Sequence, residues 1–331
     1  MNNLAIGRYR FTLQAEAPFT LTGYPGAMLR GAWGHALRQL ACSTGRAECT
    51  GCPVREHCRY TTLFEPLPET AQGAARNIPP PYIIEAALAR PRRLAQGESW
   101  HFEMVLFGAV LSELPLIVWA WQQAASAGFG DQQSPMRLIT VEYESAPGDW
   151  QPVWASRGHA VQRMTSREPR VEEHAPSLTY RSTKPHQVAD NNVKSYTVIS
   201  SAVIKLITPS RIQHKGRICA PQQLTAEILL TSLWRKIELY LTHYLQMEVP
   251  QPPSMQHIRL QPLSLTRQRW ERHSRRQQTA MRLDGMLGAL ELHGSLDDWW
   301  PWLWLGQYTH LGKNTSFGLG QYQLKEPCER Q

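Results

Sequence analysis

The order in which apolar patterns follow one another constrains the fold of this chain more than any other feature. An alternating, strand-like stretch at 8–15 precedes a helical pattern at 26–42, as judged from the spacing of the apolar residues. Two alternating stretches, a second helical pattern and a last strand pattern follow, at 81–89, 99–108, 114–126 and 136–144. This β-α-β-β-α-β order is typical of the split βαβ unit.

The second half of the chain repeats this order in outline. A strand is predicted at 195–212, ending at Thr208-Pro209, and a long amphipathic helix at 225–245. A candidate pair of strands at 284–294, a helix beginning at a Ser295 cap and a closing strand at 320–324 complete the pattern. The sequence therefore predicts an α+β protein with tandem ferredoxin-like (RRM-like) domains and a Cys-rich insertion.

The expected domain boundaries follow from these patterns. Residues 1–155 form the N-terminal ferredoxin-like domain, with the cysteine insertion at 42–58, and residues 196–331 form the C-terminal one. The segment 156–195 between them is polar, basic and without a clear period, which predicts a linker or an exposed loop.

The positive charge is concentrated in two stretches of the chain. The protein carries a formal net charge of +8, with 35 Lys and Arg against 27 Asp and Glu. Residues 157–217 hold eleven Lys or Arg and four Asp or Glu, and residues 251–283 hold seven Arg and one Glu. Such local excess indicates a surface for a polyanion, because arginine favours phosphates and base stacking. A solvated surface without a partner is the alternative.

Four cysteines lie within seventeen residues, spaced C-x6-C-x2-C-x5-C; they are Cys42, Cys49, Cys52 and Cys58. In a reducing compartment this spacing favours a structural metal site, with zinc as the first expectation and an iron–sulfur cluster as its rival. His57 could replace one thiolate. The alternative is four reduced thiols, one or two of them in the core. The chain begins with a strand-like stretch and has no secretory signal or apolar span, so we expect a cytoplasmic protein.

A glycine-rich stretch, HLGKNTSFGLGQY, occupies residues 310–322 near the end of the chain. Glycines allow positive φ and close approach of a ligand to the backbone. The expected RNA contacts are Gly312, Lys313, Asn314, Thr315, Ser316, Phe317 and Gly318, with charge from the lysine and base stacking by the phenylalanine. A tight turn from helix to strand is the equally plain alternative. The stretch is neither G-x-G-x-x-G nor a P-loop, which argues against a nucleotide cofactor.

The same stretch resembles a known family. GKNTSFGLGQYQL (312–324) is similar to the terminal glycine-rich motif of the RAMP superfamily, the RNA-binding proteins of CRISPR systems. Further stretches resemble one branch, the precursor-crRNA processing endoribonucleases: MLRGAWGHALRQLAC, CTGCPVREHCRYTTLFEP, PPPYIIEA, VIKLITPSRI, RQRWERHSRRQ and MRLDGMLGALELHG. The resemblance implies tandem ferredoxin-like domains, binding of the CRISPR repeat RNA, and metal-independent cleavage at the 3′ base of the repeat stem. It also implies a place beside other Cas subunits of the effector complex.

Cleavage of this kind needs a base for the 2′-hydroxyl, an acid for the leaving oxygen and a cation for the phosphorane. His35 is the first candidate for proton transfer, because the family often draws a histidine from its first domain. Arg30 and Arg38 on the same predicted helix would serve the phosphate, and Tyr24 would help to hold it. His310 and His273 are rivals.

Two further groups of residues are assigned to binding or to the core. Arginines within 269–276 are expected to contact the RNA stem through phosphates, and they are Arg269, Arg272, Arg275 and Arg276. The tryptophans at 299, 300, 302 and 304 are expected to pack in the core rather than to stack bases. A non-catalytic subunit that holds the crRNA hairpin is the alternative function. A zinc-dependent nucleic-acid adaptor is a third.

Overall fold

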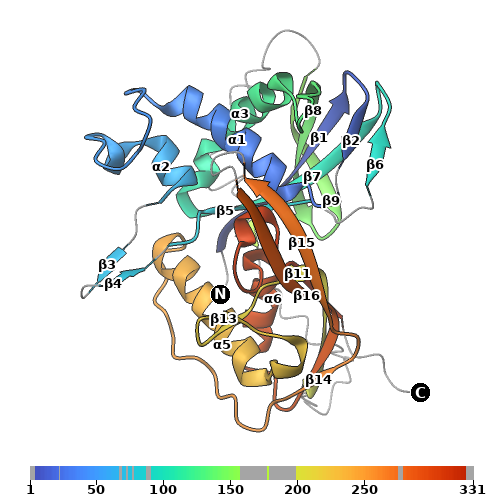
Figure 1. The fold of residues 1–331 in the computed structure, drawn as a ribbon. Helices are drawn as coiled ribbons and strands as arrows, with labels where there is room; N and C mark the ends of the chain where they lie inside the picture. The colour runs from blue at the N-terminus through green and yellow to red at the C-terminus, as the bar shows by residue number, and fades with distance from the viewer. Residues whose placement is uncertain are drawn as a thin grey trace, which may run out of the picture. The chain divides into compact units, whose positions relative to one another are not determined.

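The computed structural model describes residues 4–21, 23–66, 69–71, 74–76, 78–86, 91–156, 177–178, 199–274 and 279–325 (Figure 1). The chain divides into two compact units, which are Met1–Leu178 with Thr242–Met247, and Thr179–Leu241 with Glu248–Gln331. The predicted linker at 156–195 falls almost wholly outside the described residues, so it stays a prediction.

The first unit is built on an antiparallel sheet in the order β5-β7-β1-β8-β9. Its elements are β1 (Leu4–Ala15), α1 (Gly26–Ala41), β5 (Tyr82–Glu85), β7 (Ser99–Phe107), α3 (Leu114–Ala127), β8 (Met136–Ala146) and β9 (Asp149–Ala155). The first and third strands of the βαββαβ order, β1 and β7, are neighbours and antiparallel. This arrangement confirms the predicted ferredoxin-like fold.

Alternation along the strands explains where the core of the first unit lies. Phe11 of β1 and Phe102 of β7 stack with ring centroids 5.4 Å apart, and Trp121 of α3 lies 4.5 Å from Phe102. Trp33 of α1 stacks on Trp121 at 5.9 Å, so α1 and α3 cover the same face of the sheet. Gly34 makes room on α1 for the ring of Phe64 from α2 (Arg59–Phe64), because an added Cβ would lie 2.2 Å from that ring.

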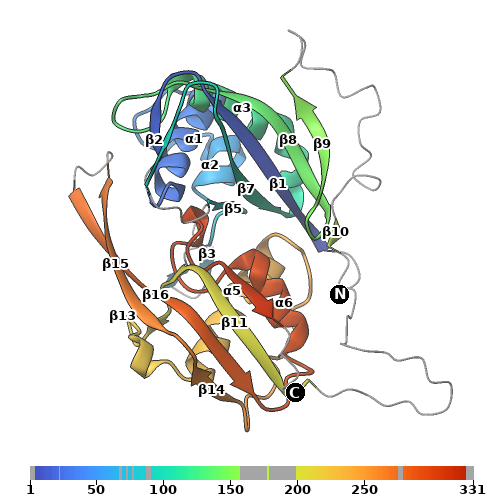
Figure 2. The same ribbon diagram turned by 90° about the vertical axis from the view of Figure 1, so that its right-hand side faces the viewer.

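The second unit repeats the same topology, with the sheet order β14-β16-β11-β17 (Figure 2). Its elements are β11 (Ser201–Ser210), α5 (Ala226–His243), β14 (Arg259–Pro262), β15 (Thr266–Ser274), β16 (Thr279–His293), α6 (Trp300–Thr309) and β17 (Tyr322–Lys325). Leu229, Leu233 and Ile237 of α5 are buried, as are Leu290 and Leu292 of β16. The tandem repeat predicted from the sequence is therefore confirmed.

Short strands and turns complete both units. In the first unit β2 (Phe19–Leu21) pairs with β6 (Arg92–Leu94), β3 (Glu69–Ala71) with β4 (Ala74–Arg76), and β10 (Ser177–Leu178) with β1. In the second unit β12 (Gln213–His214) pairs with β13 (Arg217–Ile218). Single-turn 3-10 helices lie at Arg55–His57, Pro221–Gln223 and Thr315–Phe317, and a longer one lies at Gly108–Glu113.

Two predictions for the second unit are wrong in detail. The candidate strand pair at 284–294 is part of one long strand, β16, which pairs with β15 and β14 along its length. The helix expected from Ser295 begins at Trp300, because the chain first makes a turn in which the Trp299 N–H donates to the Leu296 carbonyl oxygen at 3.0 Å. Ser295 is therefore not the helix cap.

Three of the four tryptophans of this segment pack in the core, as predicted, whereas Trp304 is partly exposed. Trp299 is fully buried, and Trp300 and Trp302 are nearly so. The ring of Trp302 meets that of Trp234 edge to face at 4.9 Å. Among the helices in the described part of the chain, none is long and apolar enough to cross a membrane.

Candidate functional site

One face of helix α1 is exposed and carries the first candidate for proton transfer. Gly31, His35 and Gln39 follow one another at helical spacing, and all three are exposed. The side-chain nitrogen of Gln39 lies 3.1 Å from Nε2 of His35. When that amide donates, Nε2 is the acceptor and the ring proton sits on Nδ1, so Gln39 fixes the tautomer of His35. At Gly31 an added Cβ would meet nothing within 4 Å.

The two arginines predicted beside His35 are engaged elsewhere in the first unit. The guanidinium of Arg30 lies 4.1 Å from the centroid of the Phe64 ring. Burial raises the pKa of the Tyr82 hydroxyl to about 12, and the nearby charge of Arg30 opposes that rise. Arg38 donates to the carbonyl oxygen of Arg46 and, at 2.7 Å, to that of Ala47. A role for either arginine at the scissile phosphate stays a prediction, and this placement does not favour it.

Tyr24 precedes α1 and is half-buried. Burial raises the pKa of its hydroxyl well above the ordinary value. The phenol therefore stays protonated at physiological pH, where it can donate a hydrogen bond but cannot serve as a base. A role in holding a phosphate, as predicted, agrees with this chemistry and is otherwise untested.

The glycine-rich loop lies in the second unit, between α6 and β17, against the end of β11. The pairing of β11 with β16 shifts register between Leu206 and Ser210, and the chain continues through Pro209 at this irregularity. The loop pairs with the displaced backbone: Lys313 N–H donates to the Arg211 carbonyl oxygen at 3.0 Å, and Gly320 N–H to that of Pro209 at 3.0 Å. The loop is therefore held against the end of β11 by backbone hydrogen bonds.

Thr208 of β11 forms hydrogen bonds with two residues at the C-terminal end of the glycine-rich loop. Its side chain is fully buried, its hydroxyl donates to the carbonyl oxygen of Gly318 at 2.6 Å, and it accepts from the Gln321 N–H at 2.9 Å. A buried hydroxyl with two partners is costly to remove, because both partners lose their hydrogen bond in a place that water does not reach. From the sequence, Thr208 was predicted only as the end of a strand.

Replacing Thr208 by valine is expected to lower the free energy of unfolding by about 1–3 kcal/mol, because both partners of the hydroxyl are left unpaired. Valine preserves the shape of threonine, so the loss reports the hydroxyl. Thr208→Ser is the matched control, since it keeps the hydroxyl and loses only a methyl group. Urea denaturation of both variants measures the effect. A valine variant no less stable than the serine variant would remove the argument for Thr208.

The glycines of the loop serve the chain's own backbone. Gly312, Gly318 and Gly320 all have positive φ, at 78°, 83° and 75°. A Cβ on Gly312 would lie 2.4 Å from the Arg211 carbonyl oxygen, and one on Gly320 would lie 1.9 Å from that of Leu311. The predicted reason for these glycines, close approach of a ligand, is thus not needed to explain Gly312 and Gly320.

The predicted RNA contacts of the loop divide by exposure. Lys313 is exposed, whereas Gly312, Thr315 and Gly318 are buried. Asn314, Ser316 and Phe317 are partly exposed. His310, a rival for proton transfer, is fully buried, and its Nδ1 lies 3.1 Å from the Leu319 carbonyl oxygen. We therefore assign His310 to holding the loop.

A lysine that the sequence analysis did not single out lies beside the loop. Nζ of Lys236, on α5, donates to the hydroxyl oxygen of Thr315 at 3.3 Å. Burial, together with the charge of Lys313, lowers the pKa of Lys236 to about 8. Helical spacing could have indicated that Lys236 is not on the exposed face of α5, because it lies in the same row as the buried residues Leu229, Leu233 and Tyr240.

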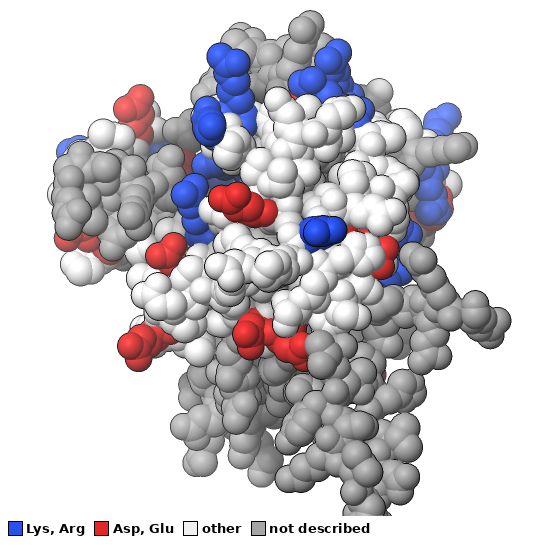
Figure 3. All heavy atoms as spheres, turned by 90° about the horizontal axis from the view of Figure 1, so that it is seen from below, with Lys and Arg blue, Asp and Glu red and all other residues white. Residues whose placement is uncertain are grey.

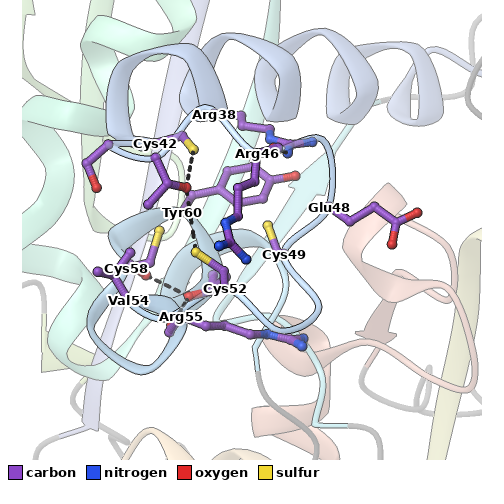
Figure 4. A pocket seen from close by; sticks show the side chains of 13 residues that line it. Arg38, Cys42, Arg46, Glu48, Cys49, Cys52, Val54, Arg55, Cys58 and Tyr60 are labelled. Atoms are coloured by element: carbon purple, nitrogen blue, oxygen red, sulfur yellow. Dashed lines mark hydrogen bonds between the residues drawn. The ribbon is translucent and has the colours of Figure 1, made fainter.

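The four cysteines of the predicted metal site line one small cavity in the first unit (Figure 4). They are unpaired thiols. The Thr44 hydroxyl lies between two of them, 3.8 Å from Sγ of Cys42 and 3.6 Å from Sγ of Cys52. Among the described residues, no three His, Cys, Asp or Glu side chains are placed so that they could share a metal ion. The zinc expectation thus stays a prediction that requires the thiols to draw together.

The predicted arginine contacts fall on the hairpin of β15 and β16. Arg269 is exposed, and Arg272 pairs in register with Met281. Arg275 and Arg276 lie outside the described residues, as does most of the basic stretch 157–198. His273, the other rival for proton transfer, lies in β15 opposite Ala280. On the face drawn in Figure 3, the Lys and Arg side chains lie in several separate groups, some of them beside Asp or Glu side chains.

Comparison with known families follows the division into two units. Residues 4–168 match the model of an N-terminal domain, and residues 204–322 match that of the CRISPR-associated endoribonuclease Cas6. The second match spans the glycine-rich loop. No curated protein matches the sequence.

Solved structures share the fold at low sequence identity. A partial Cas6-RT-Cas1–Cas2 complex is 14% identical with a TM-score of 0.53, covering 98% of this chain and 46% of that one. The Cas6-RT-Cas1–Cas2 complex is also 14% identical with a TM-score of 0.53, and the match covers 98% of this chain and 29% of that one. A Cas6 product complex is 13% identical with a TM-score of 0.50, and the match covers 97% of this chain and 99% of that one. The chain thus spans less than half the length of the first two chains that it matches.

Proposed function

We propose that the chain binds CRISPR repeat RNA and cleaves precursor crRNA, because residues 204–322 match the model of the CRISPR-associated endoribonuclease Cas6 family. The observation that carries the proposal is this family match, because it covers the unit that presents the glycine-rich loop. The first unit contributes the exposed face of α1, where His35 can meet a substrate. Other Cas proteins are the proposed partners, and the cut is proposed at the 3′ base of the repeat stem.

The proposed reaction needs no metal. The RNA's own 2′-hydroxyl attacks the adjacent phosphorus, the bond from phosphorus to the 5′-oxygen breaks, and a 2′,3′-cyclic phosphate and a 5′-hydroxyl result. The protein has to align the attack, take the proton of the 2′-hydroxyl and supply one to the leaving oxygen. His35 is the proposed proton-transfer residue, and Gln39 is the proposed positioning residue that sets its tautomer.

Cleavage of repeat RNA in EDTA tests this function. We expect the purified chain to cut a hairpin repeat transcript at one position in excess EDTA. RNA with a 2′-deoxy nucleotide at the scissile position should bind as tightly and remain intact, because it lacks the attacking group. Equal cutting of both RNAs would refute attack by the 2′-hydroxyl.

A non-catalytic subunit that holds the crRNA hairpin is the second candidate. The engagement of Arg30 with Phe64 and of Arg38 with Ala47 favours it, because these cations are held away from a substrate bound at His35. This candidate predicts tight, salt-sensitive binding of the hairpin without any product. The EDTA assay therefore separates the two functions.

A structural zinc ion in the first unit is part of the same proposal. Its support is that four thiols within one segment line a single cavity, since thiolates are ligands that zinc prefers. Zinc would hold the segment after α1 and would leave no open position for catalysis. Cleavage of RNA would not pass through it.

Metal analysis of the purified, reduced protein is expected to find about one zinc per chain and no absorption of an iron–sulfur cluster. Cys52→Ser should release most of the metal. Cys219→Ser is the matched control, because Cys219 is a buried cysteine of the second unit, outside the block. Metal-free protein with an unchanged unfolding temperature would end the zinc hypothesis.

A further inference from the structure

Two lysines of the second unit lie near each other, and among the described residues no carboxylate forms a salt bridge with either of them. Lys236 is half-buried on α5, and Lys313 is exposed on the glycine-rich loop. The effects that shift the pKa of Lys236 are burial and the charge of Lys313, and both act against its protonated form. Within the described part of the chain, no carboxylate forms an ion pair with Lys236. Such an arrangement is stabilised by an anion that lies between the two ammonium groups.

The position of the Lys236 ammonium group is fixed by the loop itself. Its Nζ donates to the Thr315 hydroxyl, and Thr315 is buried. An ammonium group has three donors, so one bond to Thr315 leaves others for a ligand. The loop in turn is held by Thr208, by the Pro209 carbonyl oxygen and by the Arg211 carbonyl oxygen. The two lysines are therefore carried by elements that keep their spacing.

We propose that Lys236 and Lys313 together bind one backbone phosphate of the RNA, with Thr315 holding the ammonium group of Lys236. The ligand is a phosphodiester oxyanion, recognised by charge rather than by base sequence. This inference rests on the proposed function, because it takes the bound polyanion to be the repeat RNA. It adds a contact on α5 that lies outside the glycine-rich motif.

The proposal gives RNA binding a defined dependence on pH. The pKa of Lys236 in the free protein is about 8. A phosphate beside it favours the charged form, so the pKa rises on binding and RNA binding takes up a proton. Affinity is therefore highest below pH 8 and falls as the pH rises through 8 towards the pKa of the complex. Lys313 from the loop is the charged group that faces Lys236, and Thr315 is its hydrogen-bond partner.

The test measures the affinity of a repeat hairpin whose scissile nucleotide is 2′-deoxy, from pH 6.5 to 9.5 and at several salt concentrations. Lys236→Met is expected to weaken binding at pH 7 roughly tenfold and to lower the slope of log K against log salt by about one. Lys236→Arg should retain the affinity and flatten the fall between pH 7 and 9. Lys325→Met is the matched control, because it removes an exposed lysine at the far end of β17 from the loop.

The possible outcomes separate this inference from the proposed function. Wild-type protein that ignores the hairpin at low salt would overturn the proposed function itself. Wild-type protein that binds tightly, beside a folded Lys236→Met variant with the same affinity and salt slope, would overturn only the Lys236 contact. An unchanged pH profile in Lys236→Arg would overturn it too. Circular dichroism of each variant confirms that it is folded.

Discussion

His35→Ala is expected to lower the single-turnover rate of RNA cleavage by a factor of about 10²–10⁴, the usual contribution of a general acid or base. The affinity for the uncut hairpin should change by less than about twofold, because His35 is one exposed side chain on α1. Cleavage is measured with enzyme in excess over labelled repeat RNA, and affinity is measured with the 2′-deoxy hairpin.

Two further variants sharpen this result. His101→Ala is the matched control, since His101 is an exposed histidine of the same unit on strand β7 and is expected to leave the rate unchanged. Gln39→Ala should slow cleavage less than His35→Ala, because it removes only the hydrogen bond that sets the tautomer of His35 and leaves the imidazole in place. Full activity of His35→Ala would move proton transfer to another residue, with His273 as the next to be tested.

The fold could be predicted from the sequence because the apolar periodicity of each segment and the order of the predicted strands and helices indicate the same fold. Alternation at 8–15 and 99–108 places Phe11 and Phe102 on one face of the sheet, and the helical spacing at 26–42 turns Trp33 towards them. Each half has to bury a helix pair on one side of its sheet, and the split βαβ order does this with short connections. Local residue patterns were therefore enough to predict the fold of both units.

The errors arose where tertiary contacts overrode local signals. The stretch 284–294 was predicted to form a pair of strands, but its Gly285 and Gly288 lie within the single strand β16. Gly288 has a φ of 127°, and a Cβ there would lie 1.9 Å from the Ser264 carbonyl oxygen. Likewise, Ser295 and the acids after it resemble a helix cap, but the helix begins at Trp300. Neither the close approach of Gly288 to Ser264 nor the turn before Trp300 can be predicted from the spacing of residues in the sequence.

The candidate site could be predicted only in part, for a related reason. Sequence spacing placed His35 on an amphipathic helix and found the loop at 310–322. Spacing does not tell what a long side chain reaches, and Arg30 and Arg38 reach Phe64 and the backbone of the next loop. Lys236 was missed because a lysine inside a helix pattern suggests an exposed position, whereas its partner, Thr315, is distant in sequence.

Gly320→Ala is expected to be among the most damaging single changes in the second unit. Its φ of 75° costs alanine about 1–2 kcal/mol, and the added Cβ would lie 1.9 Å from the Leu311 carbonyl oxygen. To relieve the clash, the loop has to give up the bond from Leu311 N–H to the Gly320 carbonyl oxygen at 2.9 Å, and its position on Pro209. We expect a loss of roughly 3–5 kcal/mol in the free energy of unfolding.

RNA binding should weaken in the same variant by about tenfold or more, because displacement of the loop separates Lys313 from Lys236. Gly216→Ala is the matched control: its φ is 79°, but an added Cβ would meet nothing within 4 Å. The difference between the two variants in urea denaturation isolates the close backbone contact from the strain of positive φ. If Gly320→Ala were as stable as Gly216→Ala yet failed to bind RNA, the glycine would serve the approach of the ligand instead, and the original interpretation of this loop would be restored.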